Sequence, residues 1–561
     1  MPPENASVAL LGALSKLLTE TAAVSLRLDV PGVSEARETQ LEVIDQLSDY
    51  VLPRLVQLDA PVVVVVGGST GAGKSTLVNS LIGERVTESG VLRPTTRSPV
   101  LVHHPDDGDW FLPDRVLPDL QRASLTANPE YALRVVPSAR VPRGLAILDA
   151  PDIDSIDEGN RKLAGQLLAA ADLWLFVTSA ARYADQVPWD YLKHAADRST
   201  SLALVLDRTP PEAVTEVRGH LLRMMASRGL ADSPLFTVRE ASTDRDGLLP
   251  PEEVEPVSSW LREIAADPLV RWTVMKRTLD GAIRHNVYRA HDVADALELQ
   301  VEAATQLYGA ADTIYDASLE NAATALTNGS LLRGRLLTAW RDFEESGDVS
   351  DLAEKRRLRR RLAEGLTGRN QRARAVGDAA HAAVLSLLVV YSESAADAAA
   401  RVWQESDAGR VLLAPTRGLD RPSQDLRHRL DRVVTEWQAG LTRALHDTGD
   451  RNRKLAQVLE HQAESLTAVL TVVSLNSRQG ATSGRAALES LMGTQLDELV
   501  TQAHRALLRS VGEVFQGEKQ RFLDLTDSPD TLLAARNTLR EAAQQADYAR
   551  HTDALDEGTL Q

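Results

Sequence analysis

The feature that most constrains the fold is a five-valine run, Val62–Val66, that leads into a glycine-rich segment ending in Gly73-Lys74-Ser75-Thr76. Five valines are too few to span a membrane and too apolar for a strand with one wet face, so they predict a strand buried on both faces of a parallel sheet. The segment from Gly68 to Ser75 fits the pattern G-x-x-x-x-G-K-[ST], and the apolar spacing from Leu77 to Ile82 predicts the helix that should follow it. The sequence therefore predicts a phosphate-binding loop.

The residue types in this loop match the chemistry of phosphate binding. Glycines let consecutive backbone N–H groups turn towards phosphate oxygens at the positive end of the following helix. Lys74 is predicted to reach the β- and γ-phosphates of a nucleotide, and the Ser75 hydroxyl to hold Mg²⁺. A chance glycine-rich turn is the alternative, and the presence of strand, loop and helix together argues against it. The predicted nucleotide-binding segment comprises Gly68, Ser69, Thr70, Gly71, Ala72, Gly73, Lys74, Ser75 and Thr76.

Composition limits what else the chain can be. Its 561 residues contain 43% hydrophobic but only 4% aromatic residues, so the core must depend on Leu, Val and Ala, which suits helices. A net charge of −17 argues against general nucleic-acid binding. The absence of cysteine excludes disulfides and thiolate metal sites and fits a cytoplasmic location. We expect no transmembrane helix and no signal peptide, so any membrane contact should be peripheral.

The pattern of apolar residues predicts an α/β part and an all-α part. Residues 60–250 alternate apolar strands with helical segments, as a doubly wound P-loop domain does. Residues 251–561 have long stretches of helical spacing, which predict an extended antiparallel bundle, and the two helices within residues 1–59 are expected to pack on it. Strands are expected near Val62–Val66, Val100–His103, Leu133–Val136, Leu145–Leu148, Leu173–Thr178, Leu202–Leu206 and Leu235–Val238, and long helices over Pro268–Asn328, Val349–Glu405, Pro422–Val473, Arg485–Leu525 and Pro529–His551.

Two further segments carry candidate metal ligands. An apolar strand ends in Asp149, which we expect to coordinate Mg²⁺ through water, although a strand-end Asp is often only a turn former. Thr95 and Thr96 lie in a loop where a threonine could close on Mg²⁺ and the γ-phosphate and then release after hydrolysis. Tandem threonines are also common turn residues, so the residues alone leave both possibilities open.

The order and spacing of these motifs resemble the GTPases of the translation-factor and Ras-type class. The run Arg93-Pro94-Thr95-Thr96-Arg97-Ser98-Pro99, with the long helical region behind it, is similar to bacterial dynamin-like proteins, particularly those of actinobacteria. The segments from Asp149 to Ser155, from Ala181 to Asp185 and from Asp246 to Pro250 share this similarity. In the nucleotide domain the resemblance rests on specific motifs. In the helical part it rests only on the general arrangement of long helices.

The resemblance implies roles for particular residues. Lys74, Thr96 and Asp149 correspond to the catalytic group, and Ser75, Thr96 and Asp149 to the residues around the metal. Thr96 is the better match of the two threonines to the switch threonine, and Asp149 matches the first residue of the D-x-x-G motif. The cofactors implied are GTP and Mg²⁺.

Three departures from the family pattern stand out. Asp152 occupies the position of the motif glycine, where the resemblance implies that its backbone N–H faces the γ-phosphate and that the hinge is stiffer. Thr70-Gly71 stands where eukaryotic dynamins have Gln-Ser. The base-reading motif [NT]-K-x-D is represented by Asp207-Arg208-Thr209-Pro210, in which Asp207 and Arg208 could contact the base but Pro210 replaces the guanine-reading acid. Guanine specificity therefore follows from the resemblance and not from these residues.

Two features of the helical half could touch lipid. One is the basic run Lys355–Arg361 with Arg369, Arg372 and Arg374 beyond it, for which a solvated helix face paired with acids is the alternative. The other is the apolar run Leu466–Leu475, beside a loop that contains glycine, for which a buried seam of the bundle fits at least as well. The run Val384–Val390 is expected to be core.

By resemblance, the chain is expected to be a dynamin-like GTPase that hydrolyses GTP and couples the nucleotide state to self-association at the membrane, with a division site as one setting. Expected partners are another copy or a related dynamin-like protein, and a peripheral anionic membrane at the inner face of the cell membrane; no nucleic acid is expected. The alternatives are a non-membrane GTPase in ribosome or complex assembly, an adenine-nucleotide regulatory ATPase, and a nucleotide-dependent scaffold that barely hydrolyses.

Overall fold

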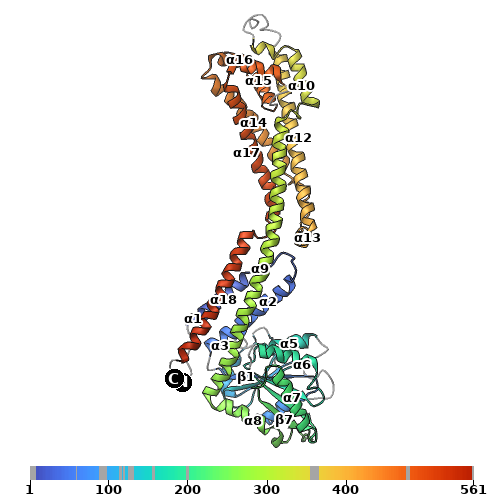
Figure 1. Cartoon of the computed structure of the whole chain (residues 1–561), viewed down its shortest axis with the longest axis vertical. Coiled ribbons are helices and arrows are strands. Elements are labelled where there is room, and N and C mark those ends of the chain that lie inside the picture. Colours follow the sequence, from blue (N-terminus) through green and yellow to red (C-terminus); the bar gives the residue numbers. More distant parts are fainter. Residues whose placement is uncertain are drawn as a thin grey trace. The chain divides into compact units, whose positions relative to one another are not determined.

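A computed structural model describes residues 8–57, 60–87, 98–112, 117, 120–123, 132–154, 158–197, 201–353, 366–475 and 481–558. The chain divides into two compact units (Figure 1). Unit 1 comprises Met1–Leu26, Gly32–Glu298 and Leu533–Gln561, and unit 2 comprises Arg27–Pro31 and Leu299–Leu532. The chain passes between the units on either side of Arg27–Pro31 and within two helices, α9 (Pro268–Thr327) and α18 (Pro529–Gly558).

Unit 1 is built on a seven-stranded mixed sheet with the strand order β3-β2-β4-β1-β5-β6-β7. The valine run forms the central strand β1, which pairs in parallel with β4 and β5 and is buried along its whole length. Strand β2 is antiparallel to β4, so the sheet is not purely parallel. All seven expected strands are present: β1 (Val62–Gly68), β2 (Val100–His103), β3 (Arg134–Pro137), β4 (Leu145–Asp149), β5 (Leu173–Ser179), β6 (Ser201–Thr209) and β7 (Leu235–Arg239).

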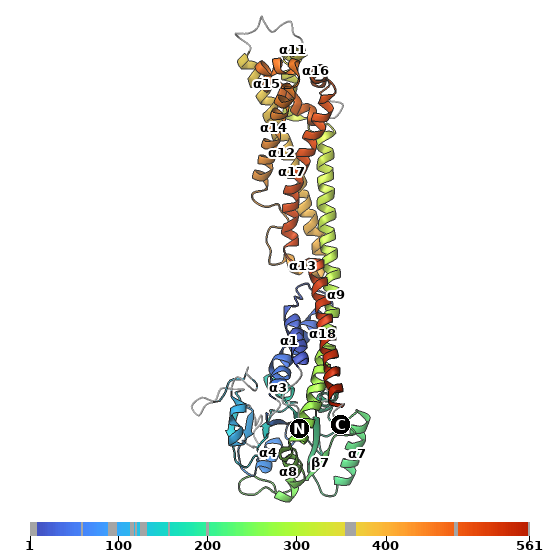
Figure 2. The same ribbon diagram turned by 90° about the vertical axis from the view of Figure 1, so that its left-hand side faces the viewer.

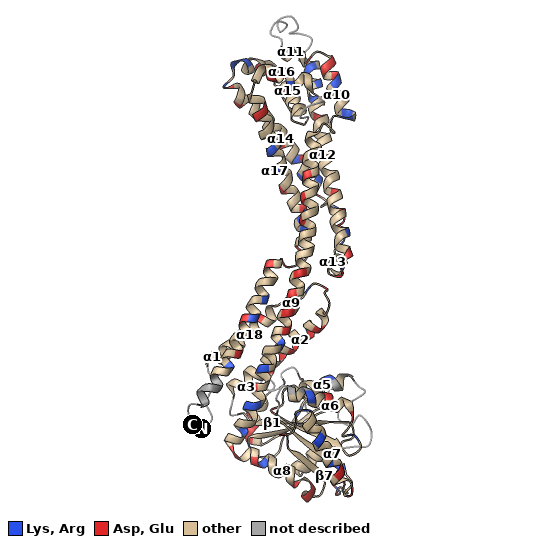
Figure 3. Cartoon of the chain, viewed as in Figure 1, with Lys and Arg blue, Asp and Glu red and all other residues tan. Residues whose placement is uncertain are grey.

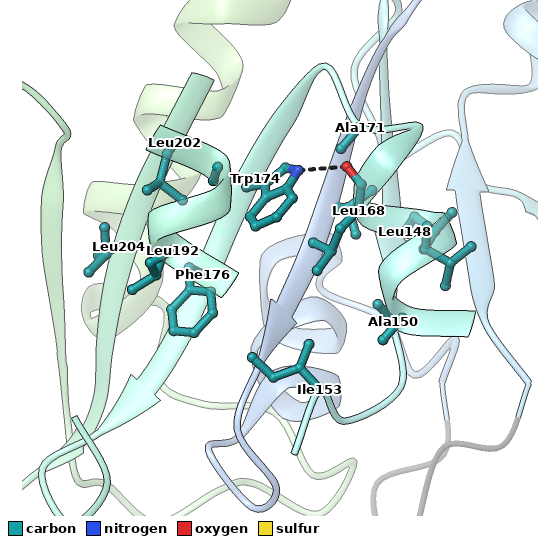
Figure 4. Packing of buried hydrophobic residues seen from close by; sticks show 14 of the residues in the cluster. Leu148, Ala150, Ile153, Leu168, Ala171, Trp174, Phe176, Leu192, Leu202 and Leu204 are labelled. Carbon is teal, nitrogen blue, oxygen red and sulfur yellow. Dashed lines mark hydrogen bonds between the residues drawn. The ribbon is translucent and has the colours of Figure 1, made fainter. Parts of the chain in front are cut away.

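Helices cover both faces of this sheet, as the predicted doubly wound fold requires. One core cluster joins alternate strand residues to α5 (Glu158–Ala169), α6 (Gln186–Asp197) and α7 (Val214–Ser227). Figure 4 shows its centre, where the indole N–H of Trp174 donates to the carbonyl of Leu168 at 2.7 Å. The second cluster packs the other face against α4 (Lys74–Ile82), α8 (Pro251–Ala266) and the start of α9. The short helix η2 (Pro105–Phe111) contributes Phe111 to the first cluster.

The N-terminal segment forms α1 (Val8–Ala23), α2 (Val33–Gln46), the π-helical turn η1 (Leu47–Val51) and α3 (Leu52–Val56), all within the described part of unit 1. Lys16 of α1 donates to Gln545 of α18 at 3.1 Å, and Glu42 of α2 pairs with Arg289 of α9 at 3.0 Å. Helix α18 also pairs with α9 within this unit, through Arg540 and Asp295 at 2.6 Å (Figure 2). The N-terminal helices therefore lie against the parts of α9 and α18 that belong to unit 1.

A single buried carboxyl group, that of Asp172 at the start of β5, joins three distant parts of unit 1. It forms an ion pair with Arg54 of α3, and its Oδ2 accepts the backbone N–H of Val63 at 2.8 Å. The hydroxyl of Tyr50 also bonds to it, at 3.2 Å. The backbone carbonyl of Asp172 accepts the hydroxyl of Thr278 on α9 at 2.7 Å. Because these partners come from the N-terminal helices, β1 and α9, Asp172 is their common anchor.

The secondary-structure elements named in the described part of unit 2 are all helices, joined by short turns and loops. Two of its long helices end earlier than the sequence suggests. The helix expected over Pro422–Val473 is two helices, broken at Asp450–Asn452, and the one expected over Arg485–Leu525 is broken at Gly493, whose backbone is left-handed (φ 58°). The helices are α10 (Gly334–Glu345), α11 (Ser350–Ala353), α12 (Leu366–Glu405), α13 (Asp407–Leu413), α14 (Leu426–Gly449), α15 (Arg453–Leu475), α16 (Thr482–Met492) and α17 (Gln495–Leu523), with the C-terminal part of α9.

The two apolar runs singled out in the helical half are mostly packed inside it. From Leu466 to Leu475 nearly every side chain is buried, so in this conformation the run is a seam of the bundle and not an exposed lipid contact. In the run Val384–Val390, Val384, Leu385 and Leu388 are buried, as expected of core residues, whereas Val390 is 59% exposed.

One described helical stretch, Gly368–Glu405 in α12, is long and apolar enough to cross a membrane by length and composition alone. Core helices of soluble proteins meet the same criterion. This helix packs its buried face against α10, α14 and α15.

The described basic residues near the proposed lipid contact are paired with acids, in keeping with the mixture of charges along these helices (Figure 3). Arg369 and Arg372 both pair with Asp348, at 3.0 and 2.8 Å, and Arg374 pairs with Glu464 at 2.6 Å. The run Lys355–Arg361 lies outside the described residues.

Candidate nucleotide-phosphate site

The segment between β1 and α4 has the backbone geometry of a phosphate loop, and two of its glycines are required by close contacts. Gly68 has φ +146°, and a Cβ there would lie 1.9 Å from the carbonyl oxygen of Val177. Gly73 caps the N-terminus of α4 with φ +99°, and a Cβ there would lie 2.1 Å from Oδ2 of Asp207. Since real Cβ atoms do not approach so closely, a larger residue at either position would displace the loop.

Lys74 is held inside the loop. Its side chain is 5% exposed, and Nζ donates to the carbonyl oxygens of Gly68 and Ser69, each at 3.1 Å. It also forms an ion pair with Asp152. A buried ammonium group that points back along the loop is the feature expected of a residue that binds phosphate oxygens.

Ser75 and Asp149 meet beside Lys74. The Ser75 hydroxyl donates to Oδ2 of Asp149 at 2.7 Å, and the Asp149 side chain is fully buried. Burial raises the pKa of Asp149 to about 6, against the hydrogen bond from Ser75 and the charge of Lys74, which lower it. Its second oxygen, Oδ1, has no hydrogen-bond partner among the described residues.

An Mg²⁺ ion fits this pair of residues. A buried carboxylate oxygen with no partner is costly unless a cation or water satisfies it. Magnesium takes oxygen ligands and keeps several waters and substrate phosphates around it, so a hydroxyl and one carboxylate suffice from the protein. No group of three or more His, Cys, Asp or Glu residues that could hold a metal occurs in the described ranges.

Two residues that sequence reasoning did not select, Asp154 and Arg182, also belong to the site. Asp154 Oδ1 accepts both the backbone N–H of Thr70, at 2.6 Å, and its hydroxyl, at 2.7 Å. Its Oδ2 accepts Arg182 at 2.7 Å. The sequence contained three acids in the run Asp149 to Asp154, and nothing in their spacing distinguishes the one that would bond the loop.

Thr87 is a third such residue. It is 2% exposed, and its hydroxyl donates to the backbone carbonyl of Ser75 at 3.4 Å. Oδ1 of Asn79 on α4 accepts the backbone N–H groups of Val86 and Thr87, both at 2.9 Å. The segment that leaves α4 is thereby folded back over the metal-ligand candidates, an arrangement that no local sequence pattern signals.

The candidate base-reading residues lie at the end of β6. Asp207 is buried against Gly73, and burial raises its pKa to about 6, opposed by its hydrogen bond from the Arg208 backbone and by the Arg208 charge. Arg208 is exposed and has a left-handed backbone (φ 49°). The strand register shifts between Leu206 and Thr209 at this point. Both Asp207 and the exposed Arg208 extend to the loop at Gly73, where a Cβ would lie 3.4 Å from Nε of Arg208.

The remaining predicted residues fall in two groups. Ser69, Thr70, Gly71, Ala72 and Thr76 are described: Ala72 is buried, Gly71 has φ +74°, and the Ser69 hydroxyl is buried with no hydrogen-bond partner in the described part of the chain. Thr76 lies in the first turn of α4, where its carbonyl accepts the Ser80 hydroxyl at 2.7 Å. Thr96 lies outside the described residues, and its role as switch threonine stays a prediction.

The sequence of this site was compared with models of known protein families. A model of the dynamin family matches residues 63–116, which include β1, the phosphate loop, α4 and β2. The segment that carries the phosphate loop is therefore similar to that of dynamin-family proteins. The resemblance predicted from the sequence is thereby confirmed for the part of this dynamin-like chain that carries Lys74 and Ser75.

Similar proteins extend beyond that segment. A chloroplastic FZO-like protein of Arabidopsis thaliana, named as a probable transmembrane GTPase, is 21% identical over 258 residues. The match covers 44% of the dynamin-like chain and about a quarter (26%) of that relative's length.

Solved structures with related chains have low TM-scores. One chain of an oligomerised bacterial dynamin pair, described as sensing and tethering membranes, matches with 11% identity and a TM-score of 0.43, covering 96% of this chain and 95% of that one. Toc33 of Arabidopsis thaliana with Mg²⁺ and GMPPNP matches with 17% identity and a TM-score of 0.24, covering 41% and 93%. With TM-scores this low, neither match adds to the argument from the site.

Proposed function

We propose that this dynamin-like chain binds GTP with Mg²⁺ and hydrolyses it to GDP and phosphate. The observation that carries the proposal is the Ser75–Asp149 pair, buried beside Lys74 inside a loop of the dynamin family. Backbone N–H groups of the loop and the N-terminus of α4 favour phosphate oxygens, and Lys74 adds a positive charge with little exposure to water. Magnesium, when bound, would neutralise charge that develops on the phosphates during transfer to water.

In this proposal the residues of the chain position the phosphates, the metal ion and the attacking water, and none of them reacts covalently. Lys74 binds the β- and γ-phosphates, Ser75 and Asp149 orient the metal and its waters, and Thr96 closes over the γ-phosphate. Phosphoryl transfer requires mostly positioned charge and an oriented water, so no strong general base is needed.

Recognition of the base is assigned to the β6 end. Arg208, exposed and beside the loop at Gly73, would cover the base, while Asp207 supports the loop at the same glycine. Because Pro210 replaces the usual acid, an ATPase remains the competing outcome of the binding experiment below.

We further propose that nucleotide state alters self-association at a membrane, through the segments after Asp149 and around Thr96. Support comes from the family and from the FZO-like relative, which is itself named as a transmembrane GTPase. Contact of this chain with a membrane would be peripheral, at the cytoplasmic face, with a related dynamin-like protein as partner and a division site as one setting.

The proposal is tested by calorimetric titration of the full chain with non-hydrolysable GTP and ATP analogues in the presence of Mg²⁺. We expect binding that selects GTP and that falls at least about 100-fold in Lys74→Ala, because a charge-assisted phosphate contact is lost inside a buried site. Lys193→Ala, which removes an exposed lysine on α6, is the matched control and should bind as the wild type does.

Four outcomes would change the proposal. Preference for the ATP analogue would make the chain an adenine-nucleotide protein. Phosphate release is measured separately with GTP itself, and binding without release would make the chain a scaffold. Equal binding by wild type and Lys74→Ala would refute the site. If GTP binds, sedimentation with anionic liposomes in the GTP- and GDP-bound states tests the membrane step, and absence of co-sedimentation in both states would favour a role in complex assembly away from membranes.

A further inference from the structure

Two carboxyl groups from the segment that follows Asp149 contact residues of the phosphate loop. Asp152 forms an ion pair with Lys74, and Asp154 accepts the N–H and the hydroxyl of Thr70 at 2.6 and 2.7 Å. A loop whose N–H groups and lysine suit phosphate oxygens therefore holds carboxylate oxygens at two points.

The segment between these contacts is fixed and not loosely placed. Ile153, between the two acids, is fully buried in the core cluster of the sheet, where Figure 4 shows it below Trp174. Its backbone N–H donates to the carbonyl of Gly68 at 3.4 Å, and the second oxygen of Asp154 accepts Arg182 at 2.7 Å. The three consecutive residues Asp152, Ile153 and Asp154 thus all contact the loop or its neighbours.

The ion pair with Asp152 gives the buried Lys74 the counter-charge that it requires. Lys74 is 5% exposed, and a buried ammonium group without a counter-charge is strongly disfavoured. Asp152 supplies that counter-charge. The phosphates of a nucleotide would supply it as well, but a carboxylate and a phosphate at the same lysine repel each other.

We propose that the segment Asp152–Asp154 is a built-in substitute for the phosphates of the nucleotide. Without nucleotide it neutralises Lys74, and when a triphosphate binds the carboxylates of Asp152 and Asp154 turn away from the loop while Ile153 stays packed in the core. This inference rests on the proposed function, since it names what the triphosphate displaces. The nucleotide then displaces these carboxylates instead of recruiting them, and Asp152 is a positioning residue that lowers the affinity for the triphosphate.

The affinity test uses the full chain and a non-hydrolysable GTP analogue with Mg²⁺. Asp152→Asn keeps the shape of the side chain but removes the competing charge, so we expect about tenfold tighter binding, the effect of one charge-assisted hydrogen bond. Asp190→Asn, which makes the same charge change at an exposed position of α6, is the control and should leave the affinity within about twofold, as expected of a screened surface charge. Unchanged or weaker binding by Asp152→Asn would overturn the inference.

A second measurement tests the pair without any nucleotide. We expect Asp152→Asn to lower the melting temperature of the empty protein, because Lys74 then lacks its counter-charge, and Lys74→Met to lower it for the converse reason. The double variant should lose less than the sum of the two, since it leaves no buried charge alone. Additive losses would show that the two side chains do not interact.

The two measurements separate the inference from the proposed function. If the wild type and all variants fail to bind the analogue while the melting temperatures couple, the guanine-nucleotide function is wrong and the ion pair stands. If the analogue binds but Asp152→Asn changes neither affinity nor stability, the function stands and the substitute role is wrong.

Discussion

Asp149 in the nucleotide domain and Asp348 in the helical unit are both almost completely removed from water, yet their pKa values move in opposite directions. Burial raises the pKa of Asp149 to about 6, and one of its oxygens has no hydrogen-bond partner among the described residues. Burial also acts to raise the pKa of Asp348, but hydrogen bonds from Ser346, Arg372 and Arg369 outweigh it and lower the pKa.

The difference separates a ligand site from a structural contact. A carboxylate surrounded by its own donors stabilises the fold and has no capacity left for a ligand. A carboxylate left partly unsatisfied costs stability in the empty protein and gains it back when a cation arrives. In the described part of unit 2, the most deeply buried acid, Glu518, belongs to the first kind.

The largest change in stability is expected when a buried carboxylate that is surrounded by hydrogen-bond donors is removed. Glu518 is fully buried and accepts the backbone N–H of Ser423 and a guanidinium nitrogen of Arg521, both at 2.8 Å, and it pairs with Arg429. Glu518→Ala leaves these donors without their acceptor and should lower the stability of unit 2 by about 3 kcal/mol. Thermal unfolding measures this, with Glu513→Ala, an exposed residue of the same helix, as control.

Nucleotide affinity should be unchanged in Glu518→Ala. A loss of stability no greater than in Glu513→Ala would mean that the network is not structural, and the contrast between the two units would fail.

Removing the charge of Asp149 is expected to raise the stability of the protein instead of lowering it. Its folded-state pKa, about 6, lies above the ordinary value of 3.8, so the folded protein holds the proton more tightly and wild-type stability falls as pH rises between these values. Asp149→Asn has no such titration and should make the nucleotide-free protein more stable at pH 7.5 by about 2–3 kcal/mol. Unfolding curves of both proteins across this pH range measure the difference.

The same substitution should weaken Mg²⁺-dependent nucleotide binding, because an amide replaces the carboxylate. The stabilisation should vanish below pH about 4, where the wild-type group is protonated in both states. A variant that is less stable than the wild type at pH 7.5 would show that Asp149 is a structural acid like Asp348.

The smallest effect is expected at Asp348. Its lowered pKa means that its contribution is present above the ordinary pKa of an aspartate and is lost as pH falls through the folded-state pKa. Asp348→Asn should therefore destabilise unit 2 at neutral pH by about 1 kcal/mol, with a difference that closes in acid. Asp342→Asn, at an exposed position of α10, is the control for the loss of one negative charge.

Parallel denaturation series at neutral and acid pH measure this difference. If Asp348→Asn instead stabilised the protein at neutral pH, Asp348 would behave as Asp149 is expected to, and the contrast between these two buried acids would be wrong.

The strands were predictable from the sequence because each is an apolar run with its own local signal, and the loop because its residues are consecutive. The breaks within the helical half were harder. Asn452 begins α15 by accepting the N–H groups of Lys454 and Leu455, and a single such residue after Gly449 was outweighed by the continuous apolar spacing around it.

The nucleotide-phosphate site, too, could be predicted from the sequence only where a local pattern identifies its residues. Lys74, Ser75 and Asp149 could be found because a motif fixes their spacing, and the structure brings them together. Asp154, Arg182 and Thr87 could not, because their positions depend on how separate loops fold over α4 and the end of β4. Contacts between segments distant in sequence carry no local pattern.

The shared anchor at Asp172 has a consequence for anyone who isolates the nucleotide domain. Its partners extend from Tyr50 to Thr278, so a fragment cut at residues 60 and 250 would contain the whole sheet and lack three of the four side chains and backbone groups that complete this buried acid and its carbonyl. During synthesis, likewise, the sheet cannot finish its hydrogen bonding until the first turns of α9 have left the ribosome. The smallest independently folding piece that contains the phosphate loop should therefore begin before Tyr50 and end beyond Thr278.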